Sequence, residues 1–141
     1  MKKYESYLIQ EPVFETSVAL IVNCSFEEMK KWDEARRHPD EDPLSDREKN
    51  ANGFCYAARN KLGEHCFVVY VKKFDWTVQC MGVLIHELTH LIFRICDYKN
   101  IPIRLENDEV FCYLLEYYQR QALSKLKGHA PQLKKRNRKK S

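Results

Sequence analysis

The sequence predicts an α+β domain in which a small, mostly antiparallel sheet packs against two long helices. Residues 13–23 are rich in β-branched side chains, which favour a strand. Residues 54–59 and 65–72 have strand character, and the five residues that join them include a glycine, as is typical of a hairpin. An apolar run over residues 76–98 then contains no proline and predicts a long helix, and a second helix follows over about 108–126.

The length of 141 residues indicates one domain, which we place at residues 1–127, with a basic tail at 128–141. The apolar content of 44% and charged content of 31% are typical of a globular protein. No apolar run approaches the ~20 residues that span a bilayer. Glutamates at positions 5, 11 and 15 interrupt any signal-peptide pattern. We therefore expect a cytoplasmic protein with no membrane segment.

The positive charge is concentrated near the end of the chain. Residues 134–140 contribute +6 to a formal net charge of +4, so the remaining chain sums to −2. Such a tail can neutralise nucleic-acid phosphates without reading sequence, and that binding would weaken steeply with salt. It has no interleaved aromatic residues for base stacking. A disordered, solubilising terminus is the alternative interpretation of residues 128–141.

The six cysteines show no Cys-x-x-Cys spacing and lie mostly among apolar residues. We expect them to be buried, reduced thiols rather than disulfides, in keeping with a cytoplasmic protein.

The first helix has a clear start signal. Ser25 is followed three residues later by Glu28, the pattern of a capping box, so a short amphipathic helix is expected over residues 26–37. The next segment, 38–50, is dense in charge and contains two prolines, which favours a solvated loop. The alternative is a flap over a functional site, with His38 as an auxiliary group.

The two long helices also have candidate caps. Asp75 is the expected N-cap of the helix at residues 76–98. Asn107 or Asp108 is expected to cap the last helix, which runs to about Leu126.

The chemistry of the sequence is concentrated in His86-Glu87-Leu88-Thr89-His90. On a helix, His86 and His90 project from one face a turn apart. Two imidazoles so placed can bind one zinc ion, at roughly 2.0–2.1 Å per Zn–N bond. Glu87 lies about 100° round the helix, where it can act as general base without being a ligand. The alternative is a core helix whose two histidines share a face by coincidence.

A catalytic zinc ion typically has three protein ligands and a position for water. Asp97 lies ~10 Å along the helix from His90, too far to share an ion. Glu109, in the first turn of the last helix, is the favoured third ligand, and Glu106 is the alternative. Either could instead be a solvated carboxylate near a helix N-terminus, where negative charge is favourable.

With these residues the chain resembles the zincin metallopeptidases, in the gluzincin arrangement of His-Glu-x-x-His and a downstream glutamate. Residues 106–115 are similar to the third-ligand helix of small zincin-like proteins from phages and mobile elements, and also to ImmA/IrrE-type peptidases. The likeness covers about residues 66–120. The residues after His90 lack the glycine turn and third histidine of metzincins, and the chain lacks the second subdomain of large gluzincins.

The resemblance implies a minimal zincin-like fold with bound Zn²⁺. It implies that His86, His90 and Glu109 are zinc ligands and that Glu87 is the general base. It also implies that the strand at residues 65–72 is the sheet edge that binds an extended peptide.

The expected function is therefore zinc-dependent hydrolysis of peptide bonds in a protein or peptide substrate. A donor for the oxyanion is also expected, and the sequence leaves several candidates open: Arg94, Tyr98, Arg104, Tyr113 and Tyr117. The alternative is a zinc-containing binding or regulatory protein with little or no catalysis.

Overall fold

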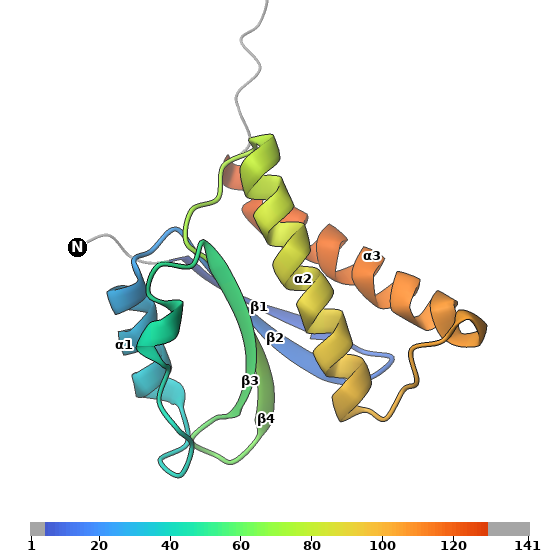
Figure 1. Cartoon of the computed structure of the whole chain (residues 1–141), viewed down its shortest axis with the longest axis horizontal. Coiled ribbons are helices and arrows are strands. Elements are labelled where there is room, and N and C mark those ends of the chain that lie inside the picture. The colour runs from blue at the N-terminus through green and yellow to red at the C-terminus, as the bar shows by residue number, and fades with distance from the viewer. Residues whose placement is uncertain (1–4, 130–141) are drawn as a thin grey trace, which may run out of the picture.

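A computed structural model describes residues 5–129 and contains a four-stranded sheet with helices on both faces (Figure 1). The strands are β1 (Glu5–Glu11), β2 (Thr16–Val22), β3 (Gly53–Arg59) and β4 (His65–Val71). The helices are α1 (Phe26–Arg36), α2 (Val78–Tyr98) and α3 (Asp108–Lys125). Short 3-10 helices lie at Asp46–Glu48, Leu105–Asn107 and Leu126–His129. The predicted α+β class is confirmed.

The strand order across the sheet is β1-β2-β4-β3. β1 and β2 are antiparallel, as are β3 and β4, whereas β2 and β4 are parallel. The sheet is thus mixed but mostly antiparallel. The expectation that residues 65–72 form the sheet edge is wrong, because β4 lies between two other strands. Residues 67–71 are all buried, as is usual for a strand covered on both faces.

The helices form two unequal layers around the sheet. α2 and α3 pack on one face, and the shorter α1 packs on the other (Figure 1). The larger core combines apolar side chains of α2 and α3, such as Leu88, with alternate residues of the strands, such as Val18, Leu20 and Val69. The smaller core lies under α1 and contains Met29 and Tyr70.

The predicted start of α1 is confirmed by its hydrogen bonds. Glu28 N donates to Ser25 Oγ at 3.1 Å, and Ser25 N donates to Glu28 Oε1 at 3.4 Å. The predicted cap of α2 is wrong by two residues, because Thr77 is the N-cap and Cys80 N donates to its Oγ1 at 3.3 Å. Asp75 instead accepts a hydrogen bond from Thr77 N at 2.9 Å and so shapes the turn before the cap.

β1 is a strand that the sequence analysis did not identify, and its pairing with β2 explains why β2 begins later than expected. The buried carboxylate of Glu11 accepts hydrogen bonds from Val13 N and Phe14 N, both at 2.8 Å. These bonds hold the turn between the two strands, so the first residues of the expected strand at 13–23 belong to the turn.

The loop at residues 38–50 is irregular apart from its 3-10 helix, as expected. Its first part is tied to the end of β3. His38 N donates to Arg59 O at 2.9 Å, and Glu41 accepts hydrogen bonds from the N and Nε atoms of Arg59.

All six cysteines are free, so the expectation of unpaired thiols is confirmed. Cys24, Cys55 and Cys96 are buried, Cys66 and Cys80 are half-buried, and Cys112 is exposed. The expectation that the thiols are buried is therefore correct only in part.

Over residues 5–129, no helix has both the length and the apolar character needed to cross a membrane. Most of the predicted basic tail, including the proposed nucleic-acid contact at residues 134–140, lies outside the described residues.

Candidate active site

α2 divides into an apolar side, which packs on the sheet, and a polar stripe. Leu84, Leu88 and Leu91 are buried in the larger core. At about 100° per residue, His86, Glu87, His90 and Arg94 fall within an arc of about 100° around the helix axis. Figure 1 shows α2 lying along the sheet, where it contacts both β3 and β4. The stripe is thereby carried beside the edge strand β3.

His86 and His90 converge as the spacing predicts. Their Nε2 atoms are 3.1 Å apart, and the two rings meet edge to face with their centres 4.7 Å apart. Two nitrogens that each lie about 2.0–2.1 Å from a tetrahedral zinc ion are themselves about 3.3 Å apart. Both side chains are exposed, so this pair of donors fits a zinc ion approached from solvent.

Glu87 lies against the start of β3 rather than beside the imidazoles in solvent. Its residue is only 6% exposed. The close neighbour is Gly53, where an added Cβ would lie 3.0 Å from the Cγ of Glu87 and 3.2 Å from a methyl carbon of Val83. The missing side chain at Gly53 therefore leaves the space that the Glu87 side chain uses.

The surroundings of the Glu87 carboxyl group favour its neutral form, in comparison with the same group in water. Burial raises the pKa of Glu87, and the nearby carboxylate of Glu48 raises it further. Positive charge on His86 and on Arg94 acts in the opposite direction. Glu87 and His86 both line a hollow of about 510 Å³ between the start of α2 and the start of β3. The carboxyl group of Glu87 and the imidazole of His86 thus border one accessible space.

The structure does not bring the predicted third ligand to the histidine pair. Glu109 and Glu106 are both exposed at the start of α3 and in the turn before it. Within the described part of the chain, no three His, Cys, Asp or Glu side chains gather closely enough to hold a metal ion. His86 and His90 therefore form a pair, and neither Glu87 nor Glu109 completes a group of three donors with them.

Helical phase explains the position of Glu109. α3 faces the core through Leu114, Tyr118 and Ala122. At about 100° per residue, Glu109 lies about 180° from Tyr118 and so projects from the opposite side of α3. The start of α3 is nevertheless close to the stripe, because Phe111 packs on Phe93, one turn beyond His90, with ring centres 5.3 Å apart.

The oxyanion candidates are separated by their contacts. Tyr113 donates a hydrogen bond to Glu11 at 2.9 Å, and Tyr117 donates one to Gln10 O. Tyr98 stacks on His65 with ring centres 3.8 Å apart. Arg94, in contrast, is exposed on the histidine stripe and is near enough to Glu87 to lower its pKa. Of these candidates, Arg94 is the one that shares the electrostatic environment of Glu87.

The outer edge of β3 is partly free. Lys72 N donates to Asn52 O at 2.9 Å, which fixes the phase of the β3–β4 pairing. The backbone groups of Gly53, Cys55 and Ala57 therefore point away from β4. Residues 5–129 supply no hydrogen-bond partner for these groups, whereas both outward groups of Arg59 are bound by the 38–41 segment. The free edge begins beside Glu87 and ends at Arg59.

A second hollow, of about 280 Å³, lies along this free edge. Its walls are the 42–48 part of the loop, residues 54–57 of β3, and the side chains of Arg37 and Arg94. The alternative prediction was a flap over the functional site at residues 38–50. Residues 42–48 of this loop do border the edge strand β3. His38 itself is bound to Arg59 and to Asp40 N at the far end of this edge.

Sequence reasoning did not identify Gly53 or Glu48 as neighbours of the motif. Asn52-Gly53 does carry a local signal, since this pair is typical of a turn or of a close backbone approach. Glu48 has no such signal, because only the folding of the loop brings it near Glu87.

Comparisons of the chain with protein-family models, with curated proteins and with solved structures gave no match.

Proposed function

We propose that this protein is a cytoplasmic, zinc-dependent metallopeptidase. The observation that carries the proposal is the convergence of the His86 and His90 Nε2 atoms to 3.1 Å, on the same helix as the buried side chain of Glu87. The unpaired state of the six thiols supports a reducing compartment.

In this proposal His86 and His90 hold the metal ion. A bound zinc ion would supply Lewis acidity to a carbonyl oxygen and lower the pKa of water towards ~7. Glu109, with Glu106 as the alternative, remains the proposed third protein ligand, and its carboxylate would have to move to the histidine pair when the metal binds. The contact of Phe111 with Phe93 keeps the start of α3 near the histidine stripe.

Glu87 is the proposed general base. It accepts a proton from the attacking water and passes it to the leaving amine of the cleaved peptide. Its position against Gly53 limits the rotation of its side chain, which keeps the carboxylate at the hollow that His86 also lines. Arg94 is the proposed donor to the developing oxyanion, because it lies on the same stripe and carries a permanent positive charge.

The free edge of β3 is the proposed binding site for the peptide backbone. This replaces the expected role of residues 65–72, whose backbone is paired on both sides. An extended peptide could pair with the outward groups of Gly53, Cys55 and Ala57, with alternate side chains entering the flanking hollows.

The proposal is tested by metal analysis and a peptide-library digest of the purified full chain. We expect about one zinc ion per chain, loss of zinc in His86→Ala, and retention of zinc with loss of cleavage in Glu87→Gln. Glu34→Gln, at an exposed site on α1, is the matched control and should cleave like the wild type. Cleavage that survives a chelator, or that survives in Glu87→Gln, would overturn the proposal.

A zinc-containing binding protein without turnover is the second candidate. It is favoured by one observation, namely that the described residues gather no third donor at the histidine pair. In that case the wild type and Glu87→Gln would bind zinc equally, and neither would cleave any member of the library.

Contact of residues 134–140 with nucleic acid is a separate proposal that is compatible with either candidate. Affinity for duplex DNA should fall steeply with salt and disappear when residues 134–141 are deleted. Affinity that persists after the deletion would rule out this role of the tail.

A further inference from the structure

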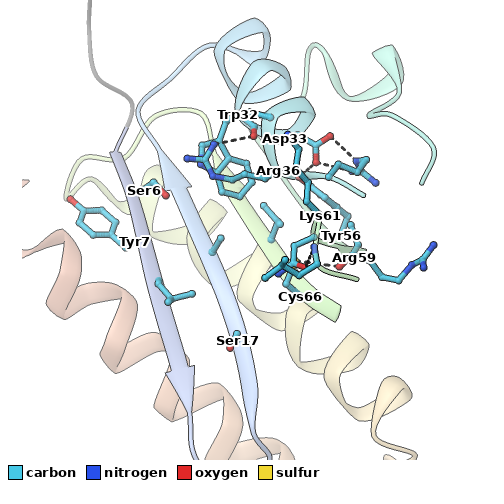
Figure 2. A pocket seen from close by; sticks show the side chains of 18 residues that line it. Ser6, Tyr7, Ser17, Trp32, Asp33, Arg36, Tyr56, Arg59, Lys61 and Cys66 are labelled. Carbon is cyan, nitrogen blue, oxygen red and sulfur yellow. Dashed lines mark hydrogen bonds and ion pairs between the residues drawn. The ribbon is translucent and has the colours of Figure 1, made fainter. Parts of the chain in front are cut away.

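The sheet face opposite α2 and α3 carries a hollow that the proposed peptidase does not use. α1 has 11 residues, whereas α2 and α3 together have 39, so α1 leaves part of its face uncovered. The uncovered part is a hollow of about 480 Å³, bounded by all four strands and by α1 (Figure 2). Its size is within the range of small-molecule binding pockets in proteins.

The floor of this hollow follows from the alternation of side chains along the strands. α1 covers Ile21, Phe54 and Tyr70, which are buried in the smaller core. Beside and beyond these residues the same face carries smaller side chains, which leave space above the sheet: Ser6, Ser17, Ala19, Ala58 and Cys66. Leu8, 61% exposed, and Leu62, 83% exposed, also line the hollow and leave apolar surface open to solvent.

The wall on the α1 side is formed by Trp32 and Arg36. The guanidinium of Arg36 lies over the Trp32 ring, 4.7 Å from its centre, and Nη1 donates to Trp32 O at 3.2 Å. Arginine has five N–H donors, so most of those on Arg36 are left for another acceptor. Figure 2 shows Trp32 and Arg36 at the end of the hollow nearest α1.

The charge around the hollow is positive. Asp33 is the acidic residue in its lining, and both of its carboxylate oxygens accept hydrogen bonds from Arg37, at 2.7 and 2.8 Å. Arg59 is paired with Glu41 at 3.0 Å. Arg36 and Lys61 form no ion pair within residues 5–129, so two cationic groups remain at the rim.

We propose that this hollow binds an amphipathic carboxylate, such as a fatty acid, with its apolar body over Ala19 and Ala58 and its carboxylate at Arg36 and Lys61. An apolar floor favours the body of such a ligand through burial of apolar surface. The cationic side chains of Arg36 and Lys61, which both line the hollow, favour its anionic head through charge-assisted hydrogen bonds. A cationic amphiphile of the same length would still bury its apolar chain, but it would lose the hydrogen bonds to Arg36 and Lys61.

The test is isothermal titration of the full chain with dodecanoate, below its micelle-forming concentration, beside dodecyltrimethylammonium as the cationic counterpart. We expect saturable binding of dodecanoate at about one per chain and no saturable binding of the cation. Loss of the two cations in Arg36→Glu/Lys61→Glu should weaken dodecanoate binding by about tenfold or more. Lys125→Glu, an exposed charge reversal on α3, is the control and should bind like the wild type.

Ala19→Phe fills the hollow from its floor and should abolish dodecanoate binding. The exposed rim variants keep the test decisive if Ala19→Phe fails to fold. Equal binding of the two amphiphiles would overturn the proposal, as would non-saturating uptake of dodecanoate. Dodecanoate affinity that is unchanged in Arg36→Glu/Lys61→Glu would overturn it as well.

Discussion

Gly53 and Glu87 lie in contact across the start of β3 and the middle of α2, and a Cβ on Gly53 would come within 3.0 Å of the Glu87 Cγ and 2.7 Å of Tyr70 O. Gly53→Ala should therefore displace both the strand and the carboxylate. We expect a loss of about 1–3 kcal/mol in unfolding free energy, measured by urea denaturation, together with loss of any Glu87-dependent cleavage. Gly82→Ala is the matched control for stability, because its Cβ would meet nothing within 4 Å on α2. It should stabilise the protein by about 0.4–1 kcal/mol, and a stable, fully active Gly53→Ala would contradict the role of this contact.

Thr77 begins the helix that carries the site. Its side chain accepts a hydrogen bond from Cys80 N, so Thr77→Ala leaves one helix N–H without its cap. We expect a loss of about 1 kcal/mol in unfolding free energy. Thr77→Ser keeps the hydroxyl and should lose much less. Equal losses in the two variants would show that the methyl group, rather than the cap, is responsible.

Asp75 gives a pH dependence that can be measured separately. Hydrogen bonds from Thr77, first from its side chain and then from its backbone N–H, hold the pKa of Asp75 at about 2. A lowered pKa favours the folded state above the ordinary value of about 3.9, and this contribution is lost as the pH falls towards 2. Asp75→Asn should thus be less stable than the wild type at pH 6, and the difference should vanish near pH 2. The measurement is the thermal unfolding of both proteins between pH 2 and pH 6. A stability difference that stays constant with pH would contradict this role of Asp75.

Asp33 ties the end of α1 to β3. It accepts two hydrogen bonds from Arg37 and one from the hydroxyl of Tyr56 at 2.6 Å, and its side chain is 4% exposed. Asp33→Ala leaves the Arg37 cation without its partner in a mostly buried place, which should lower the unfolding free energy by about 3 kcal/mol. The neighbouring exposed site provides the control, since Glu34→Ala should change it by about 0.5 kcal/mol or less. A small effect in Asp33→Ala would show that water replaces the carboxylate there.

The thiols should react in an order set by exposure and by pKa. Burial raises the pKa of Cys24 and of Cys55 to about 12, so neither is appreciably ionised at pH 8. Cys112 is exposed and should be the first to react with a thiol reagent in the native protein. Cys112→Ser should remove the fast phase and leave the slow phases. A fast phase that remains in Cys112→Ser would contradict the order.

The elements with local signals were those that the sequence predicted well. The capping box at Ser25 and Glu28 and the hairpin of β3 and β4 depend on neighbouring residues, and both are present. β1 was overlooked because residues 1–12 are mixed in character. Its alternation becomes clear only when Ile9 is seen to be buried and Leu8 exposed.

The order of the strands had no local signal. The insertion of β4 between β2 and β3 depends on the parallel pairing of Val18 with Phe67, two residues far apart in the chain. Because this pairing could not be predicted, residues 65–72 were wrongly assigned to the edge of the sheet. The candidate site divides in the same way, since the spacing within α2 predicts the convergence of His86 and His90, whereas the position of Glu109 depends on the rotation of α3 about its own axis.

The parallel contact between β2 and β4 also has a kinetic consequence. Val18 and Phe67 are 49 positions apart, so the chain must close a long loop before the centre of the sheet exists. The core under α2 includes residues of β2 as well as of β4, so α2 has no complete surface to lie on until then. Substitutions that weaken the pairing of β2 with β4 should therefore delay the moment at which a newly made chain acquires its assembled site.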